Sequence, residues 1–218
     1  WHEESGFFRA RTSDGAFVPS VDLTDIFDEN YVEGDSWQYL WFVPHDLDGF
    51  ADLFGGPEGA VAKLDEFFTS SLQTQEDIAD LYYWHGNEPD IHAPFLYSAW
   101  GQPEKARRWS RWVADTRYGL GHDGLDGNDD AGTLSAWYVF ESLGLFPLAG
   151  TDLWLLGAPR FPHARLRLPE GWLEVRAPGL LEGDERVARV TLNGEVLDRS
   201  VLTWDDLAGG AVLTFEAE

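Results

Sequence analysis

The chain has 218 residues, of which 44% are hydrophobic and 15% aromatic, so it can bury a core and is not a disordered chain. Its formal net charge of −24 excludes a nucleic-acid backbone as the partner, because that binding needs clustered Lys and Arg. No apolar run approaches the length of a membrane span. Most acids are expected to form a solvated surface, so only acids inside motifs carry a functional interpretation.

Single residue types narrow the class of protein further. The 11 Trp either fill a core or form stacking platforms in a ligand cleft, and sugars bind such platforms. The absence of Cys excludes disulfides and thiolate metal sites. The chain starts at Trp1 without an initiator Met or a signal-peptide core, so we expect a processed or truncated piece of a longer protein.

Helical patterns dominate the first 150 residues, after a stretch over 1–32 that is expected to be mostly loop. Capping residues, Pro starts and apolar residues at helical spacing predict a series of helices joined by loops that carry the polar motifs. The expected helices are 35–43, 47–54, 58–69, a stretch around 75–84, 94–100, 103–118 and 131–143.

After Gly150 the apolar residues recur with a period of two, and Asn193-Gly194 is a strong hairpin-turn signal. The expected strands are 153–156, 164–168, 172–176, 187–192 and 211–215. We therefore predict a mainly α segment over 1–150 and a small antiparallel β domain over 151–218. The expected role of the β domain is to pack against the helices.

The first motif with chemical potential is residues 31–39 (YVEGDSWQY), followed by Pro44-His45-Asp46. Glu33 precedes a glycine at the start of an aromatic-faced helix. Partial burial there would raise the pKa of the carboxyl, as a general acid requires. The alternative is an acid at a helix N-terminus, stabilised only by the helix dipole.

The second motif is residues 84–92 (WHGNEPDIH). Adjacent amide and carboxylate oxygens, with exposed backbone carbonyls, are the ligands that a hard cation such as Ca²⁺ takes. The two histidines also admit zinc, but their spacing matches no usual zinc signature.

The third motif, residues 127–132 (GNDDAG), leads directly into the 131–143 helix. Flanking glycines let the backbone approach a ligand closely, and two adjacent acids lie where a helix begins. A catalytic or metal site and a simple N-cap both fit this loop. Separated carboxylates, a cation site and many Trp together indicate glycoside hydrolysis, in which one acid protonates the leaving oxygen and another acts as base or nucleophile. The separation of the two carboxylates, and hence the stereochemistry, is left open by the sequence.

These motifs resemble, in the same order, those of glycoside hydrolase family 92, which comprises calcium-dependent, inverting exo-α-mannosidases. The matching strings are residues 33–39 with 44–46, residues 86–90 with His92, residues 101–103 (GQP), residues 127–130 with 135–140 (SAWYVF), and the closing segment from 156 to 215. The resemblance covers nearly the whole chain. It departs from the family at Asp35, where Asn is common, and at Ala131 and Thr133 beside the third motif.

The resemblance implies roles for particular residues. Glu33 would be the general acid, and Asp130 the general base, with Asp129 or Asn128 in support. Asn87 and Glu88 would hold Ca²⁺. The expected sugar contacts are Trp37, Gln38 and His85, although Trp37 is equally compatible with a place in the core.

The resemblance also implies that the chain is incomplete, since family members are much longer and place an N-terminal β-sandwich and the first part of an (α/α)6 barrel ahead of this segment. The helices over 1–150 would then be the later part of that barrel, and the missing N-terminal part would be a partner within the same polypeptide. We expect a secreted, periplasmic or cell-surface enzyme that removes terminal mannose, with α-1,2 linkages the expected preference, and a fragment that is inactive in isolation. Two other classes of function stay open: another (α/α)6-barrel glycosidase or phosphorylase, and a non-catalytic carbohydrate-binding module. The absence of an Arg, Lys and Gly phosphate cradle argues against a phosphorylase.

Overall fold

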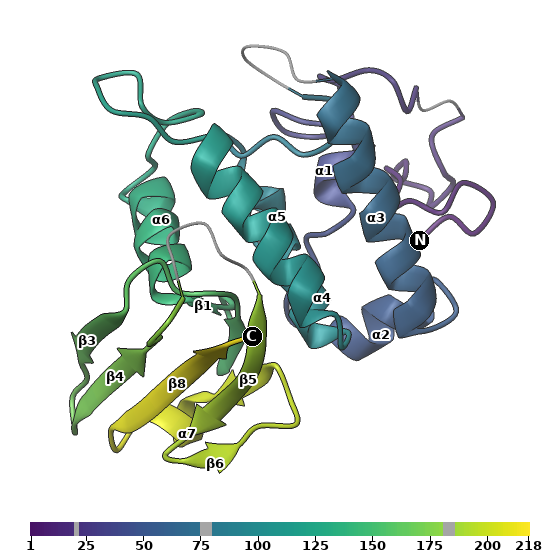
Figure 1. Cartoon of the computed structure of the whole chain (residues 1–218). Coiled ribbons are helices and arrows are strands. Elements are labelled where there is room, and N and C mark those ends of the chain that lie inside the picture. The colour runs from purple at the N-terminus through teal and green to yellow at the C-terminus, as the bar shows by residue number, and fades with distance from the viewer. Residues whose placement is uncertain (20–21, 75–79, 181–185) are drawn as a thin grey trace. The chain divides into compact units, whose positions relative to one another are not determined.

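A computed structural model describes residues 1–19, 22–74, 80–180 and 186–218 (Figure 1). These residues form two compact units, the first made of Trp1–Ala93 with Leu120–Asn128 and the second of Pro94–Gly119 with Asp129–Glu218. The predicted boundary at residue 150 falls inside the second unit. The division of the protein into domains over 1–150 and 151–218 stays a prediction. Among the described residues, no helix is long and apolar enough to cross a membrane.

The first unit is built on aromatic packing around short helices. Its elements are α1 (Ser36–Tyr39), α2 (Leu47–Asp52), α3 (Pro57–Thr74) and the 3-10 helix η1 (Glu88–Asp90). Trp41 is fully buried, and its ring lies 5.4 Å from that of Phe67 on α3 and 5.9 Å from that of Phe50 on α2. The apolar stripe predicted for α3 therefore faces this core. The helix itself starts at Pro57, where the missing N–H costs nothing.

Three helix predictions in this unit are wrong in extent, and one of them is α3, which was expected to end at residue 69 and continues to Thr74. The helix expected over 35–43 ends at Tyr39, because the Trp41 carbonyl bonds instead to the amide of Val43 at 2.8 Å and to the His92 ring. The stretch expected around 75–84 is not helical over residues 80–84, and its residues 75–79 lie outside the described part of the chain. In a helix the N–H of Tyr83 would donate to a backbone carbonyl four residues earlier. Here it donates to the side-chain hydroxyl of Ser71 on α3, at 2.9 Å.

The second unit contains the longer predicted helices close to their expected bounds. They are α5 (Pro103–Thr116) and α6 (Thr133–Leu143), while α4 (Ala93–Ala99) begins at the last residue of the first unit. Gly144 ends α6 with a φ of +76°, the left-handed conformation that closes many helices. The described helices agree with a helix-rich first part, and their membership of an (α/α)6 barrel stays a prediction.

The strands of the second unit form two sheets, and Figure 1 labels every strand of the larger one. One has the order β1-β2-β7, and the other has the order β3-β4-β8-β5-β6. The bounds are β1 (Leu145–Pro147), β2 (Leu153–Leu156), β3 (His163–Arg167), β4 (Trp172–Arg176), β5 (Val187–Leu192), β6 (Glu195–Val196), β7 (Val201–Thr203) and β8 (Ala211–Ala217), with a short helix α7 (Trp204–Leu207) before the last strand.

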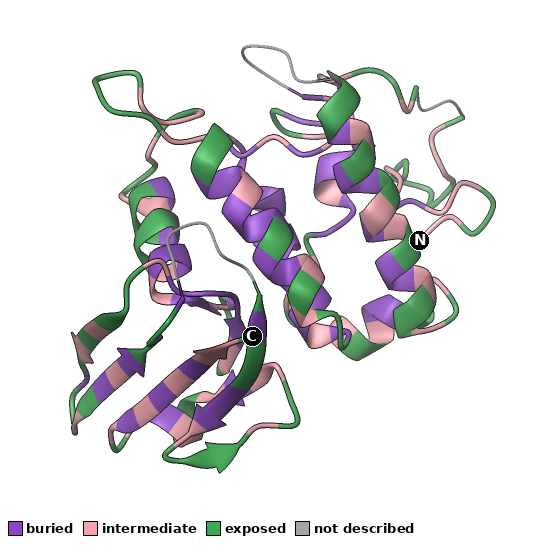
Figure 2. Cartoon of the chain, viewed as in Figure 1, coloured by how far each residue is buried: buried purple, intermediate pink, exposed green. Residues whose placement is uncertain are grey.

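The five predicted strands are confirmed to within two residues, and the predicted turn at Asn193-Gly194 joins β5 to β6. The β region is not wholly antiparallel, because β4 and β8 pair in parallel. The additional strands β1, β6 and β7 have only two or three residues each, too few for a period of two to be recognised. Along β4, buried Leu173 and Val175 alternate with exposed Trp172 and Arg176, so one face of the sheet covers a core (Figure 2).

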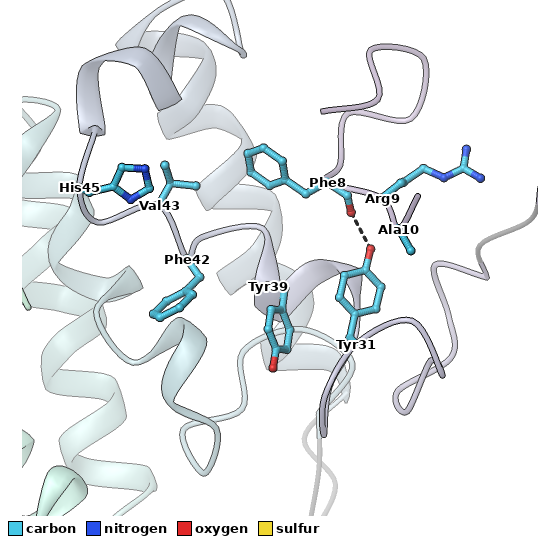
Figure 3. A pocket seen from close by; sticks show the side chains of 8 residues that line it. All are labelled: Phe8, Arg9, Ala10, Tyr31, Tyr39, Phe42, Val43 and His45. Atoms are coloured by element: carbon cyan, nitrogen blue, oxygen red, sulfur yellow. Dashed lines mark hydrogen bonds between the residues drawn. The ribbon is translucent and has the colours of Figure 1, made fainter. Parts of the chain in front are cut away.

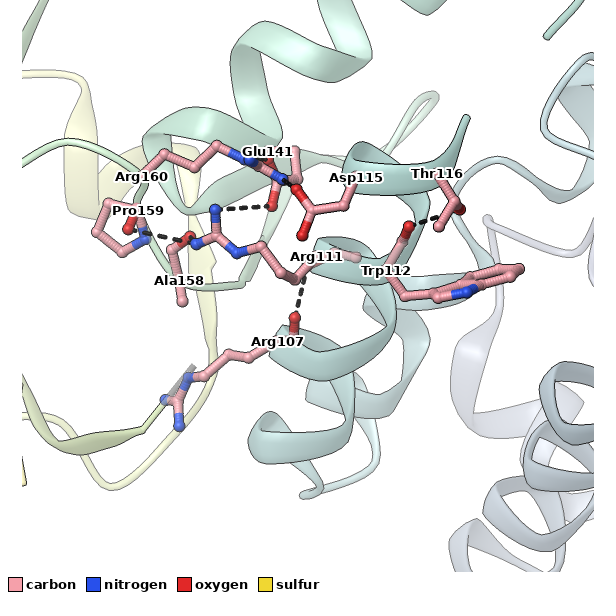
Figure 4. A network of polar contacts seen from close by, with 10 residues as sticks. Arg107, Arg111, Trp112, Asp115, Thr116, Glu141, Ala158, Pro159 and Arg160 are labelled. Atoms are coloured by element: carbon pink, nitrogen blue, oxygen red, sulfur yellow. Dashed lines mark hydrogen bonds and ion pairs between the residues drawn. The ribbon is translucent and has the colours of Figure 1, made fainter. Parts of the chain in front are cut away.

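A polar network joins α5, α6 and the segment before β3 within the second unit (Figure 4). Glu141 is only 1% exposed, and it accepts from Arg160 at 2.9 Å. Arg160 also bonds Asp115 at 2.6 Å, and Arg111 donates to the Ala158 carbonyl at 3.1 Å. These bonds fix the chain after α6 against α5. The site residues predicted for this unit lie at the opposite end of α6, where the helix begins.

Candidate active site

Glu33 lies on a turn that leads directly into α1. Its backbone φ is +54°, in the left-handed region that residues with a side chain seldom adopt. Its side chain is exposed, so the partial burial expected from the sequence is not found in this part of the chain.

A second acid of the same loop, Asp35, caps α1. Its Oδ1 accepts the N–H of Trp37 at 2.7 Å and that of Gln38 at 3.1 Å. Its Oδ2 is buried and has no hydrogen-bond partner among the described residues. Burial first, and then the charges of Asp80 and Asp28, raise the pKa of Asp35 to about 8, although the two capping bonds lower it. The helix start is therefore held by Asp35, which leaves Glu33 without a structural task in the cap.

Asn87 connects the second motif to the first. Its Nδ2 donates to the Glu33 carbonyl at 2.9 Å and to the Gln38 Oε1 at 3.0 Å. Both amide hydrogens have partners in this arrangement, so Asn87 Oδ1 is left as an acceptor. Glu88 follows immediately and opens η1.

The donor set of this segment fits a hard cation by chemical type. Asn87 and Glu88 supply amide and carboxylate oxygens, whereas Ca²⁺ takes six to eight oxygens in all. Nearby Asp90 is fully buried, and its Oδ1 has no hydrogen-bond partner among the described residues. Burial, followed by the charges of Asp35 and of two further acids, raises the pKa of Asp90 well above its ordinary value, and a bound cation would reverse that effect. In the described part of the chain, no three His, Asp or Glu side chains are close enough to form a metal site on their own.

The two histidines of the second motif have structural contacts. His85 is fully buried, and its Nδ1 lies 2.6 Å from the Tyr83 hydroxyl. His92 is 5% exposed and donates from Nε2 to the Trp41 carbonyl at 2.8 Å. Burial lowers the pKa of His92 to about 4, which keeps its ring neutral. These contacts do not favour the zinc alternative.

The side chains predicted to touch sugar are buried in the described structure. Trp37 is 6% exposed, with its ring 4.8 Å from that of Phe7 and under the Lys63 ammonium at 3.8 Å. Gln38 is fully buried and donates to the Asp80 carbonyl at 2.7 Å. For Trp37 these contacts are those of a core residue, the reading that the sequence also allowed. Sugar contact by Trp37, Gln38 and His85 stays a prediction.

The start of the third motif lies against the second within the first unit. A Cβ added to Gly86 would meet the Asp126 carbonyl at 2.6 Å, and one added to Gly127 would meet the Gly86 Cα at 2.8 Å. The Trp84 Nε1 also donates to the Asp126 carbonyl, at 3.4 Å. Glycine at both positions thus permits a backbone approach that any side chain would block. Asn128 follows one residue later and is exposed.

Asp129 and Asp130 belong to the second unit, where they divide two tasks. The Asp129 carboxylate accepts both the N–H and the hydroxyl of Ser135 at 2.8 Å, and these bonds lower its pKa. Asp130 is exposed, and its φ is +41°. Its carbonyl accepts the Thr133 hydroxyl at 2.7 Å. Asp129 therefore bonds the first turn of α6, whose N-cap is Gly132, and Asp130 is presented on a left-handed turn.

A cavity of about 490 Å³ next to the Glu33 loop was not indicated by any sequence motif (Figure 3). The Tyr31 hydroxyl donates to the Phe8 carbonyl at 2.6 Å, and the Tyr39 hydroxyl donates to the Val32 carbonyl at 2.7 Å. Burial and then the charge of Glu33 raise the pKa of Tyr39, which places this ring near the acid. The residues that line the cavity are Phe8, Arg9, Ala10, Tyr31, Tyr39, Phe42, Val43 and His45. The density of aromatic residues on both sides of the first motif was the one signal in the sequence.

Comparisons with known proteins agree on one family. The model of the glycosyl hydrolase family 92 catalytic domain matches residues 1–218. A relative from Arthroderma benhamiae, named an uncharacterized secreted glycosidase, is 29% identical over 95% of this chain. The structure of the family GH92 α-mannosidase BT3965 from Bacteroides thetaiotaomicron matches with a TM-score of 0.86 at 33% identity over 99% of the chain. The GH92 inverting mannosidase BT2199 from the same organism matches with a TM-score of 0.84 at 31% identity, also over 99% of the chain. The chain spans 28% of the fungal relative, 28% of BT3965 and 31% of BT2199.

Proposed function

Because the chain belongs to glycosyl hydrolase family 92, we propose that it forms part of the catalytic domain of an enzyme that removes terminal α-linked mannose from glycans. The chain matches less than a third of each structural relative, so the proposal concerns a longer polypeptide in which this segment contributes catalytic residues. The mannosidase names of those relatives support mannose as the released sugar.

One observation supports the proposed roles most strongly. In each of two loops, the carboxylate of one acid bonds the first turn of the following helix and the other acid is exposed on a left-handed residue. Asp35 caps α1 beside Glu33, and Asp129 bonds Ser135 in the first turn of α6 beside Asp130. Holding a residue with a side chain in this conformation costs about 1–2 kcal/mol, and such costs concentrate at functional sites. Among the described residues, the side chains that bond each helix start are those of Asp35 and Asp129, and the carboxylates of Glu33 and Asp130 take no part.

We assign the general acid to Glu33 and the general base to Asp130. Glu33 would hold its proton at the carboxyl and give it to the glycosidic oxygen as the bond breaks. Asp130 would accept a proton from the water that attacks the anomeric carbon, and this attack would invert the anomeric centre. Asp129 would support Asp130 by fixing the start of α6, through the bonds to Ser135.

Asn87 and Glu88 are the residues that would hold a Ca²⁺ ion in this proposal. When bound, the ion would orient sugar hydroxyls and stabilise developing charge at the sugar. Chelation of the full-length polypeptide is expected to abolish turnover, and added Ca²⁺ is expected to restore it. Turnover that is indifferent to the chelator would reject the metal role.

Two carboxamide variants of the full-length polypeptide test the acid and the base. Glu33→Gln and Asp130→Asn should each lower kcat/KM for α-linked mannobiose by about 10²- to 10⁴-fold. Glu29→Gln, at an exposed acid outside the site, is the matched control and should keep full activity. If both site variants retain activity, the chain is a non-catalytic module of its parent protein.

Three finer features of the proposal have their own measurements. An inverting reaction should release β-mannose first, which NMR distinguishes from the α-anomer before mutarotation. The proposed α-1,2 preference should appear as the highest kcat/KM among α-1,2, α-1,3 and α-1,6 mannobiose. The isolated 218-residue chain should turn over mannosides poorly or not at all, and full turnover would contradict the idea that the site needs the rest of the polypeptide.

We also propose that the enzyme works outside the cytoplasm. The support is the fungal relative, which is named a secreted glycosidase. Fractionation of the native organism should find the full-length polypeptide in the medium, the periplasm or the cell-surface fraction.

A further inference from the structure

We propose that Asn87 and Gln38 are positioning residues that hold the backbone of Glu33 in its left-handed conformation. This inference rests on the general-acid role proposed for Glu33. It gives Asn87 and Gln38 a task that neither a cation site nor a sugar contact requires.

The geometry is a directed chain of amide hydrogen bonds. The Gln38 amide nitrogen donates to the Asp80 carbonyl at 2.7 Å, which fixes the orientation of the Gln38 side chain. Its Oε1 then faces Asn87 and accepts from Nδ2 at 3.0 Å. The same Asn87 Nδ2 donates to the Glu33 carbonyl at 2.9 Å. The last bond therefore ends on the peptide unit whose orientation sets the Glu33 turn.

The amides of Gln38 and Asn87 are shielded from water, which strengthens these hydrogen bonds. Gln38 is fully buried, and Asn87 is 7% exposed. Water competes weakly for a donor or acceptor in such surroundings, so each amide is held in one orientation. In contrast, the Glu33 side chain is exposed.

Gly34 is the steric counterpart of this arrangement. A Cβ at this position would meet Gln38 Oε1 at 2.6 Å and Asn87 Nδ2 at 2.8 Å. The two amides thus lie directly against the backbone that follows Glu33. Any side chain at residue 34 would displace them.

The chemical consequence follows from the short distance over which a proton can be transferred. A general acid must reach the leaving oxygen within about 2.6–3.2 Å. Glu33 has a φ of +54°, and without the Asn87 bond its carbonyl would be free to turn toward a more common conformation. That rotation would swing the carboxyl away from the leaving oxygen. The value of kcat/KM should therefore decrease for substrates whose leaving group needs a proton. It should change little for substrates whose leaving group departs without one.

The decisive variant is Asn87→Asp in the full-length polypeptide. It keeps the shape of the side chain and adds charge for a cation, but it replaces the donor to Glu33 with an acceptor. At saturating Ca²⁺, kcat/KM for α-linked mannobiose should fall by at least about 10²-fold. For 2,4-dinitrophenyl α-mannoside, whose leaving group needs no proton, it should fall by less than about tenfold. Asn193→Asp, in an exposed hairpin turn, is the matched control and should change neither value.

Glu33→Gln in the same pair of assays separates the possible failures. If Glu33→Gln shows no difference between the two substrates, the general-acid role itself is wrong. If Glu33→Gln shows the difference but Asn87→Asp lowers both substrates equally, or neither, the positioning role is overturned. An equal fall on both substrates that occurs only below saturating Ca²⁺ would assign Asn87 to the metal alone.

Gly34→Ala provides a second, independent perturbation. It leaves every proposed ligand and amide in the chain but pushes the amide pair away from the Glu33 peptide. It should produce the same selective loss on mannobiose, and it decides the question if Asn87→Asp does not fold. Equal activity of Gly34→Ala and wild type on both substrates would contradict the proposal.

Discussion

Replacing Asp35 by asparagine tests whether the buried cap of α1 is held as a neutral acid. Asp35 is 1% exposed, and its pKa is raised to about 8 by burial and by the charges of Asp80 and Asp28. In an unfolded chain the pKa of an aspartate is about 3.9. Between these two values the folded state keeps a proton that the unfolded state has released. The contribution of Asp35 to the free energy of unfolding should therefore fall as the pH rises from about 4 to about 8.

The size of the effect follows from the same two pKa values. Each pH unit in that window lowers the free energy of unfolding by about 1.4 kcal/mol. Ionisation of Asp35 therefore lowers it, relative to pH 4, by about 4 kcal/mol at pH 7 and about 5 kcal/mol at pH 8 and above. Asparagine keeps an oxygen for the N–H groups of Trp37 and Gln38 and cannot ionise. Asp35→Asn should therefore be about as stable as wild type near pH 4 and more stable by roughly 4 kcal/mol at pH 7. The family resemblance, in which asparagine is common at this position, agrees with this expectation.

Urea unfolding at half-unit steps from pH 4.5 to 8 measures this difference directly. The informative quantity is the unfolding free energy of Asp35→Asn minus that of wild type, because other titrating groups cancel in it. Asp52→Asn, at an exposed acid on α2, is the matched control for the loss of one surface carboxylate. A difference for Asp35→Asn that stays flat across the range, or a less stable variant at pH 7, would refute the raised pKa.

Three further perturbations probe other parts of the structure. Gly144→Ala should destabilise by at least about 2 kcal/mol in urea unfolding, because φ is +76° and a Cβ would meet the Pro159 nitrogen at 2.5 Å; an unchanged midpoint would contradict this geometry. Glu141→Ala should cost about 3–5 kcal/mol, because it leaves the guanidinium of Arg160 without its buried partner; Glu141→Gln should cost less, and equal costs would argue against an ionic role. The imidazole of His92 should titrate near pH 4 by NMR, so its contribution to stability, at most about 3 kcal/mol, is present above pH 6.5 and lost as the pH falls toward 4; a midpoint near 6.5 would show that the ring is not buried as described.

Local patterns predicted those elements whose conformation depends on neighbouring residues. The period-two segments became strands, and Asn193-Gly194 formed its hairpin with φ values of +53° and +89°. The start of α3 at Pro57 and the end of α6 at Gly144 followed the backbone preferences of those residue types. Such features need no distant partner. The motif strings, which are local as well, were sufficient to indicate family 92.

Contacts between distant residues decided what the patterns left ambiguous. The helix expected through Trp41 ends early because of a bond to His92, a residue that lies far along the sequence. The parallel pairing of β4 with β8 likewise depends on the path of the chain between them. A short apolar pattern contains no record of either partner.

The sequence by itself determined the glycosidase family, the alternation of the strands and the identity of the candidate acids. Only the tertiary structure assigned separate tasks to neighbouring acids, with Asp35 and Asp129 bonded to the first turns of helices and Glu33 and Asp130 on exposed turns. Only the tertiary structure brought Asn87 to the carbonyl of Glu33. The physical reason is that residue type fixes local backbone preference and chemical capacity, whereas burial and hydrogen-bond partners depend on which distant segments the fold brings together.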